Sequence, residues 1–513
     1  MSAEAQRRLL AGLGLAAVAL AIALAVVLLR GGGGSDEPIS ERAAELVPAD
    51  ALVFVRLSTD GEREAVDAAR ELAEGFPSWQ RARDAVLERL VVASEDDGEI
   101  DAQGEIEGWL GDEMALALLN SPTGTAESLV LLEVADEEEA RAFVARGARR
   151  SGPAQRHRGV RIDRFGAVQA AVADGFLVLG QPAAVRRAVD LTMGTGDPLS
   201  AAPTFSRLQE RLPDDRAADA YATADGLRRL LVPAGGAFSL AGVLLDRPDL
   251  EGTALSVSAQ EPGARVFVES LVPGRTGEAF EPELLDAVPE GTLAYLGSKG
   301  LDDTATRLVA TAGTEALGDL LGQAREALGT EGAAAVQDDL LALLREETAL
   351  VVLPGVPAPT MLVIARTGDE AGTQSALDRL TGSLPDLLEG AEVTTEGDVT
   401  IVTSGETQLF AAVFDGKLVL STSAQGIEAA RAPDGGIAGE ESFDEVVPDR
   451  DEPVTSVVFL DFSQLLKLGE QTGLDDSRAY LAVKPDLERV RSVGASSTGT
   501  GEDTTTEIRI SIP

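Results

Sequence analysis

The residue types that most often perform enzyme chemistry are scarce in this chain. Histidine occurs once, as His157, and cysteine does not occur. Without cysteine there is no thiol nucleophile, no thiolate metal ligand and no disulfide bond. With one histidine, a zinc site would take its remaining ligands from carboxylates, which is an uncommon donor set. The sequence therefore predicts neither thiol nor zinc chemistry.

The single histidine, His157, lies between Arg156 and Arg158. Neighbouring cations disfavour the imidazolium form of a histidine. A catalytic triad also needs a carboxylate that orients the imidazole ring, and the sequence shows none beside His157. We expect His157 to be an exposed loop residue and not a general base.

An acidic run at residues 96–101, Asp-Asp-Gly-Glu-Ile-Asp, contains oxygen ligands of the kind that calcium prefers. When Asp97 is counted as the first position of an EF-hand loop, Ala102 stands where glycine is required and Gly108 where a bidentate glutamate is required. An EF-hand is therefore excluded. A weak calcium site of another kind and a solvated loop both remain open.

Other catalytic and cofactor motifs are missing. Gly194-Thr195-Gly196 is shorter than the dinucleotide-binding fingerprint and is followed by Asp197-Pro198, so a loop is expected there. The Gly-x-Ser-x-Gly elbow, the phosphate-binding glycine-lysine loop and the His-Glu-x-x-His helix do not occur. With 86 acidic residues, no one carboxylate pair stands out as an acid/base couple. We predict no catalytic, cofactor-binding or metal-binding residue, no cofactor, and a protein that is not an enzyme.

Composition limits the class of protein and its partners. The chain has 513 residues, 44% of them hydrophobic, enough for two or three domain cores. Lys and Arg number 43 against 86 Asp and Glu, which gives a formal charge of -43. This charge repels the phosphate backbone of nucleic acids and the surface of anionic membranes. We expect no nucleic-acid partner and a well-solvated surface.

The strongest local signal is an apolar run from Leu9 to Leu29 that contains no charged residue. As a helix it would span about 30 Å, the thickness of the hydrocarbon core of a bilayer. Arg7 and Arg8 precede the run and acidic residues follow it, so the positive-inside rule places the N-terminus in the cytoplasm. A cleaved secretion signal is the alternative, although its apolar region would be shorter.

The rest of the chain contains a long internal repeat. The segment 47–54, Val-Pro-Ala-Asp-Ala-Leu-Val-Phe, resembles 288–295, Val-Pro-Glu-Gly-Thr-Leu-Ala-Tyr, at an offset of 241 (288 minus 47). Residues 174–179 and 415–420 match at the same offset, and Asp112 to Leu116 resembles Glu346 to Leu350. Several matches in one order indicate a duplication.

Each copy predicts the same succession of elements. A first strand (52–57 and 293–297) precedes helical segments, a strand pair, a helix and an Asp-Gly hairpin (168–179 and 408–420). Helices follow, beginning near Pro182 and near Ser423, and the last strands are 492–497 and 505–512. Frequent hairpins predict an α+β fold in which helices pack on an antiparallel or mixed sheet.

The predicted organisation has six parts. They are a cytoplasmic N-terminus (1–8), a transmembrane helix (9–29), a glycine-rich linker (30–45), an α+β repeat 1 (46–273), a linker (274–283) and an α+β repeat 2 (284–513). The folded part is expected to begin near Leu46.

The anchor, the glycine-rich tether, the strand 47–54 and the segment 108–113, Gly-Trp-Leu-Gly-Asp-Glu, together resemble a bacterial family. It is a domain of unknown function, family 3352, found in membrane-anchored proteins of high-GC bacteria. The resemblance covers nearly everything after Leu46. It implies no active-site residue.

These observations favour a single-pass cell-membrane protein whose C-terminal region is extracytoplasmic. Its partners would be the lipid bilayer, through residues 9–29, and an envelope protein or ligand of unknown identity. The leading hypothesis is non-enzymatic partner binding or envelope organisation. The alternatives are a carrier of a lipid or other apolar ligand between the two repeats and, less favoured, a carboxylate-dependent hydrolase.

Overall fold

The computed structural model describes most of the chain after residue 39. The described residues are 40–77, 79, 106, 108–120, 126–148, 153–165, 168–231, 250–260, 263–272, 278–300, 343, 345–355, 358–387, 390–405, 407–433, 436–447, 453–471, 478–500 and 503–512. The chain forms two compact units. Unit 1 takes Met1–Pro273 with Ala482–Leu487, and unit 2 takes Gly274–Leu481 with Glu488–Pro513.

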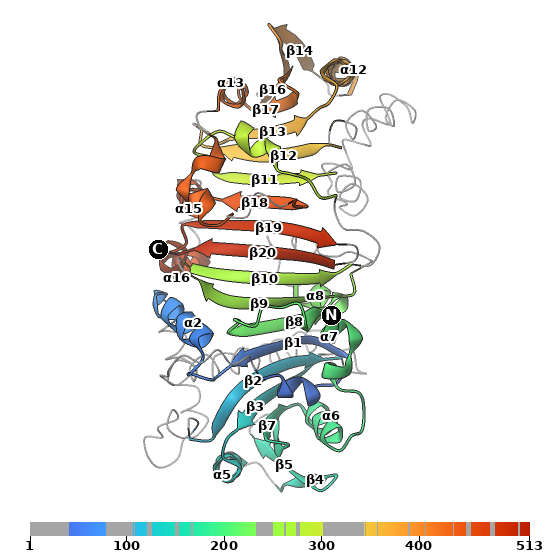
Figure 1. The fold of residues 1–513 in the computed structure, drawn as a ribbon, viewed down its shortest axis with the longest axis vertical. Helices are drawn as coiled ribbons and strands as arrows, with labels where there is room; N and C mark the ends of the chain where they lie inside the picture. The colour runs from blue at the N-terminus through green and yellow to red at the C-terminus, as the bar shows by residue number, and fades with distance from the viewer. Residues whose placement is uncertain are drawn as a thin grey trace. The chain divides into compact units, whose positions relative to one another are not determined.

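Unit 1 contains an antiparallel sheet in which β1 lies between β2 and β8 (Figure 1). The order of its strands is β4-β5-β6-β7-β3-β2-β1-β8-β9-β10. Their bounds are β1 Ala51–Ser58, β2 Leu110–Leu119, β3 Glu127–Val134, β4 Gln155–His157, β5 Val160–Phe165, β6 Val168–Ala173, β7 Phe176–Gly180, β8 Ala218–Thr223, β9 Gly252–Gln260 and β10 Gly263–Leu271.

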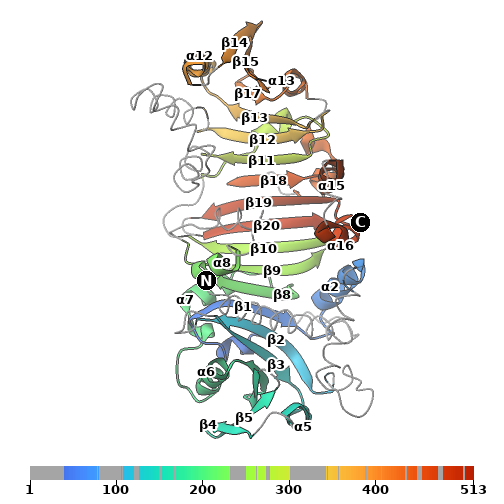
Figure 2. The same ribbon diagram turned by 180° about the vertical axis from the view of Figure 1, so that it is seen from behind.

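Helices pack on this sheet because its strands present apolar side chains on both faces. In β3, Leu129 and Leu131 belong to one buried cluster and Val130 and Leu132 to another, as the two-residue period of a strand requires. Helix α6 packs on β3, β6 and β7, and α5 packs on β5 and β6 (Figures 1 and 2). The helices of unit 1 are η1 Arg42–Glu45, α2 Glu64–Glu74, α5 Glu137–Ala148, α6 Pro182–Thr192, η2 Leu199–Ala201, α7 Pro203–Gln209 and α8 Ala224–Leu231.

Unit 2 also contains an antiparallel sheet, in which β11 lies between β12 and β18. Its strand order is β14-β15-β16-β17-β13-β12-β11-β18-β19-β20, so the connections follow the same pattern as those of unit 1. The bounds are β11 Ala294–Lys299, β12 Glu347–Leu353, β13 Thr360–Arg366, β14 Ala391–Glu396, β15 Val399–Ser404, β16 Thr407–Phe414, β17 Lys417–Ser421, β18 Ser456–Leu460, β19 Ser492–Thr500 and β20 Asp503–Ser511.

The main core of unit 2 lies between its sheet and a group of short helices. Ile427 and Ala430 of α13 and Leu284 of η4 are buried against Tyr295 and Phe459 of the strands. Helix α12 packs on β14, β16 and β17, and α13 packs on β13, β16 and β17 (Figure 2). The bounds are η4 Glu283–Ala287, α12 Glu370–Leu387, α13 Ala424–Arg431, η5 Ile437–Gly439, α14 Glu441–Asp444 and α15 Phe462–Gln471, and α16 Arg478–Leu487 contributes residues to both units.

The predicted turns and helix caps that adjacent residues specify are confirmed. Asp174-Gly175 and Asp415-Gly416 have positive φ angles at both residues and join antiparallel strands, as a type I′ turn requires. Helix α6 begins at Pro182, and the side chain of Ser423 accepts a hydrogen bond from the N–H of Gly426 at the start of α13. The α+β class with an antiparallel sheet is therefore confirmed.

Two of the predicted linkers are shorter than the sequence indicated. Residues 42–45 form η1, where Ala43 and Ala44 are buried, so the segment 30–45 is not linker throughout. Phe280, within the predicted linker 274–283, is buried and pairs with Val454. In both places, charged and glycine-rich neighbours conceal a few buried apolar residues in the sequence, and the division between the units falls at Pro273 and Gly274.

Two other predictions concern residues that lie outside the described part of the chain. These are the proposed transmembrane helix at 9–29, with the cytoplasmic residues 1–8, and the acidic run 96–101. Within the described part, no helix has both the length and the apolar character needed to cross a bilayer.

Candidate functional site

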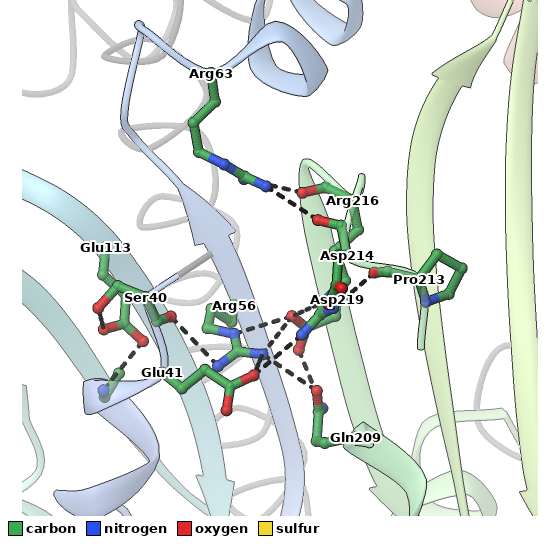
Figure 3. Close-up of polar contacts among 11 residues, drawn as sticks. Ser40, Glu41, Arg56, Arg63, Glu113, Gln209, Pro213, Asp214, Arg216 and Asp219 are labelled. Atoms are coloured by element: carbon green, nitrogen blue, oxygen red, sulfur yellow. Dashed lines mark hydrogen bonds and ion pairs between the residues drawn. The ribbon is translucent and has the colours of Figure 1, made fainter. Parts of the chain in front are cut away.

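A buried cluster of charged residues lies where β1 meets β8 in unit 1 (Figure 3). Arg56 of β1 and Asp219 of β8 are directly opposite each other, and both side chains are fully buried. The Arg56 guanidinium donates from Nε at 2.9 Å and from Nη2 at 2.7 Å to the same Asp219 oxygen. Burial alone would lower the pKa of Arg56, but the paired Asp219 raises it. The arginine is therefore held as a cation inside the unit.

The remaining members of this cluster, the Arg56 cluster, complete its hydrogen bonds. Arg216 donates to Asp219 at 3.1 Å and to Glu41 at 3.1 Å, and Gln209 both accepts from Arg56 and donates to Asp219. The Arg56 guanidinium also bonds the carbonyl oxygen of Ser40 at 3.3 Å and Glu41. These bonds tie the segment that enters unit 1 to the centre of its sheet, which is a structural role.

Glu113 is a second buried carboxylate beside this cluster. One oxygen accepts from the backbone N–H of Ala43 at 3.0 Å and the other from the Ser40 hydroxyl at 2.9 Å. In unit 2, Glu347 accepts from the backbone N–H of Leu284 at 2.9 Å. Burial raises the pKa of both carboxyl groups to about 7.

His157 is not the unpartnered loop residue that the sequence predicted. It ends β4, and its Nε2 lies 2.8 Å from an oxygen of Asp190 on α6. Arg158 contacts the same oxygen. Sequence inspection missed the carboxylate because Asp190 is 33 positions away and comes near only through the packing of α6 on the sheet.

Asp190 also borders a cleft of about 390 Å³ in unit 1. Acidic and basic side chains meet there: Asp50 is paired with Arg187, and Asp190 is paired with His157 and Arg158. Asp197 and the loop Thr195-Gly196 complete the lining. Two of the three aspartates of this cleft therefore have cationic partners. The structure confirms that residues 194–196 form a loop.

Unit 2 has a larger cleft, of about 810 Å³, at the end of the β12–β13 pair. We call it the unit 2 groove. Its lining is Pro289, Glu290, Leu353, Pro354, Gly355, Ala358, Pro359, Thr360, Met361, Thr422, Ser423, Gln425, Gly426 and Ala429. Glu290 is the only charged residue in this set. The volume is within the range of sites that bind small organic ligands.

At the corresponding place in unit 1, an arginine borders the smaller cleft. Arg187 precedes the buried pair Ala188-Val189 on α6, as Ala429 precedes the buried Ala430 on α13. The Arg187 guanidinium pairs with Asp50 and donates to the carbonyl oxygen of Asn120 at 3.3 Å. Asn120 follows the last residue of β2, and Pro354 follows the last residue of β12. With Ala429 in place of an arginine, the corresponding space in unit 2 is open.

The family model described as "Protein of unknown function (DUF3352)" matches residues 10–512. The chain belongs to the DUF3352 family. This confirms the resemblance found in the sequence, and the match extends over both units of the DUF3352 chain.

Solved structures similar to this DUF3352 chain are crystal forms of a protein named TP0453. Crystal form I is 11% identical, with a TM-score of 0.28, and covers 48% of this chain and 82% of that chain. Crystal form III is 10% identical, with a TM-score of 0.27, over 47% and 82%. No curated protein matches the DUF3352 chain significantly.

Within the described residues of this DUF3352 chain, no group of three or more His, Asp or Glu side chains is placed to hold a metal ion. Sequence inspection missed the Arg56 cluster, although an arginine inside the apolar strand 51–58 is a signal that it needs a buried partner. It missed the groove entirely, since no local pattern distinguishes Ala429 from any other helical alanine.

Proposed function

We propose that this DUF3352 chain is a non-enzymatic binding protein, held outside the cytoplasm by a membrane helix at residues 9–29. The unit 2 groove is the observation that supports this most directly. It combines the volume of a ligand site with a lining of prolines, aliphatic side chains, hydroxyls and one carboxylate. Such a lining supplies shape and apolar contact and no nucleophile paired with a base, which favours binding over catalysis.

The charged groups of unit 1 support the same proposal. Arg56 and Arg216 both donate hydrogen bonds to Asp219, and the Asp50–Arg187 pair in the unit 1 cleft is likewise satisfied internally. A catalytic centre needs at least one group whose hydrogen bonds or charge are directed to a substrate. The clusters described in unit 1 instead stabilise the fold.

We further propose that the two units arose by duplication. Supporting contacts recur at equivalent places: Val134 N–H donates to Gly175 and Thr367 N–H to Gly416, both at 2.8 Å. A second pair of contacts has its charges exchanged. Arg42 of η1 pairs with Glu133 of β3, whereas Glu283 of η4 pairs with Arg366 of β13. Duplication followed by divergence explains why one copy has a smaller cleft lined by charged residues and the other a larger groove.

Site-specific crosslinking in the native cells tests the binding function. A photoreactive amino acid replaces Met361, whose side chain is 58% exposed at the groove, and in a matched control it replaces Leu409, which is 39% exposed on β16. We expect a discrete adduct from position 361 and none of the same mass from position 409. Equal adduct patterns at the two positions, or no adduct at either, would count against a binding role for the groove.

A further inference from the structure

The chemistry of the unit 2 groove indicates what kind of molecule it accepts. We propose that it binds a small cationic amphiphile, a molecule with an aliphatic body and a positively charged head group. This inference rests on the proposed binding function and specifies its ligand. Three features carry it: the space, the apolar lining and the charge of the rim.

The space is set by two substitutions relative to unit 1. In the alignment of 47–54 with 288–295, Asp50 corresponds to Gly291, and on the helices Arg187 corresponds to Ala429. The Asp50–Arg187 pair therefore has no counterpart in unit 2. A charged pair that borders a cleft of about 390 Å³ in unit 1 has been replaced by two of the smallest side chains, and the groove in unit 2 measures about 810 Å³.

The body of the ligand is indicated by the apolar lining. Pro289, Pro354 and Pro359 contribute rigid rings, and Leu353 and Met361 contribute flexible aliphatic surface. Met361 is 58% exposed, so its side chain is accessible to a ligand in the groove. The described part of the lining contains no aromatic ring on which a flat ligand would stack. An aliphatic chain fits this surface better than an aromatic or sugar ring.

The head group is indicated by charge. Among the described residues that line the groove, Glu290 is the only charged one, and none is Lys, Arg or His. The neighbouring Glu440 accepts a hydrogen bond from the N–H of Gly291 at 2.6 Å. Burial, together with the nearby Glu290 and Asp461 carboxylates, raises the pKa of Glu440. The exposed carboxylate of Glu290 makes the rim of the groove negative, in a chain of formal charge -43, and complements a cation.

The hydroxyls of the groove do not change this assignment. Thr360 and Ser423 hydrogen-bond each other at 3.0 Å, and Thr422 accepts from the N–H of Met361 at 3.0 Å. Ser423 also caps α13 by accepting from Gly426. These hydroxyls are engaged with one another or with the backbone, and the amide of Gln425 is uncharged, so Glu290 is the group that distinguishes a cationic from an anionic head group.

Photoaffinity labelling of the full-length chain in its native membrane tests the proposal. The probe is an alkyl diazirine with a trimethylammonium head group, compared with analogues of the same chain length that carry a carboxylate or a hydroxyl group. Adducts are mapped to residues by tandem mass spectrometry, so that labelling elsewhere does not obscure the groove. We expect the ammonium probe to label Leu353, Pro354 or Met361 about three- to fivefold more than the carboxylate probe, the discrimination given by an exposed ion pair.

Two variants and a control localise the effect. Ala429→Arg should fill much of the groove and strongly reduce labelling of these residues. Glu290→Gln changes an exposed side chain, so folding is retained, and the preference for the ammonium probe should disappear. Arg187→Ala makes the reciprocal change in unit 1 and should leave labelling in unit 2 unaltered. Thermal unfolding of each variant identifies any that fails to fold.

Three results would overturn the proposal: equal labelling by the ammonium and carboxylate probes, labelling that is undiminished in Ala429→Arg, or a preference that persists in Glu290→Gln. The outcome is distinguishable from failure of the proposed function. Crosslinking from position 361 could capture a protein partner while the ammonium probe labels nothing in the groove. The proposed binding function would then be supported, and the proposal of a cationic amphiphile as the ligand would be wrong.

Discussion

The carboxylate of Glu113 accepts a hydrogen bond from the backbone N–H of Ala43, 70 positions earlier in the chain. Glu113 is on β2 and Ala43 is in η1, the short helix that precedes β1. Glu347 and Leu284 repeat this relationship in unit 2. Each unit therefore fastens the helix before its first strand to a buried carboxyl group on its second strand.

Stability should consequently fall as the pH rises through neutrality. The pKa of Glu113 is raised to about 7 by burial, above the 4.5 of an unperturbed glutamate. A raised pKa means that the folded state binds the proton more tightly, so its contribution is fully present below about pH 4.5 and is lost as the pH rises through about 7. The expected loss is about 3 kcal/mol for Glu113 and a similar amount for Glu347.

Glu113→Gln should remove the contribution of Glu113 to the pH dependence of stability. The amide keeps an oxygen that accepts from the N–H of Ala43, and it carries no charge. Thermal unfolding followed between pH 5 and pH 8 measures the slope for the parent chain, for each single variant and for the Glu113→Gln, Glu347→Gln double variant. A double variant whose melting temperature still falls as steeply with pH would show that these carboxyl groups are not the source.

Breaking the Arg56–Asp219 pair should strongly destabilise unit 1. Arg56→Met leaves Asp219 buried with one fewer cation, which costs about 3–5 kcal/mol. Unit 2 has an uncharged pair, Gly297 and Val457, at the corresponding register of β11 and β18. The double variant Arg56→Met, Asp219→Leu should therefore recover part of the loss. Urea unfolding measures both, and a double variant less stable than Arg56→Met would contradict this reading.

Gly226 of α8 is required by a close approach of two backbones. A Cβ atom there would lie 2.0 Å from the carbonyl oxygen of Leu52, so Gly226→Ala should cost about 1–3 kcal/mol through displacement of α8 or β1. Gly382 of α12 is the matched control, since nothing lies within 4 Å of the position that a Cβ atom would take there. Gly382→Ala should stabilise the chain by up to about 1 kcal/mol, the helix-propensity gain. Melting temperatures that move in the same direction would refute the assignment.

The absence of cysteine permits a clean test of topology. Single cysteines replace Ser2, before the proposed membrane helix, and Glu138, which is exposed on α5. A membrane-impermeant maleimide should label Glu138→Cys in intact cells and Ser2→Cys only after lysis. Labelling of neither residue before lysis would place the units in the cytoplasm and remove the proposed localisation.

The sequence predicted local features of this fold better than distant ones. Asp174-Gly175 specifies its turn through the backbone preferences of two adjacent residues, and Ser423 caps a helix that begins at the next residue. The pairing of Arg56 with Asp219 spans 163 positions and depends on which strands become neighbours. Periodicity reports the face on which a side chain lies and not the strand that will lie beside it.

The sequence predicted the candidate site less well than it predicted the fold. The groove is open where Ala429 has a small side chain. Its importance becomes visible only when Ala429 is compared with Arg187, the large side chain at the corresponding position of unit 1. The proline turn before β11 was found in the sequence as part of the repeat, but nothing in its residues indicates that one of its neighbours lines a cavity.

The hydrogen bonds that hold Ser40 and Glu41 also have a mechanical consequence. Arg56 bonds the Ser40 carbonyl, Arg216 bonds Glu41, and Glu113 bonds both Ser40 and Ala43. Tension applied through the preceding residues would reach β1 and β2 first and would load several ionic bonds together. These bonds would then resist, in shear, a force that pulls the N-terminal segment away from unit 1. In force spectroscopy with the chain pulled from its N-terminus, the first force peak should be lost in Arg56→Met.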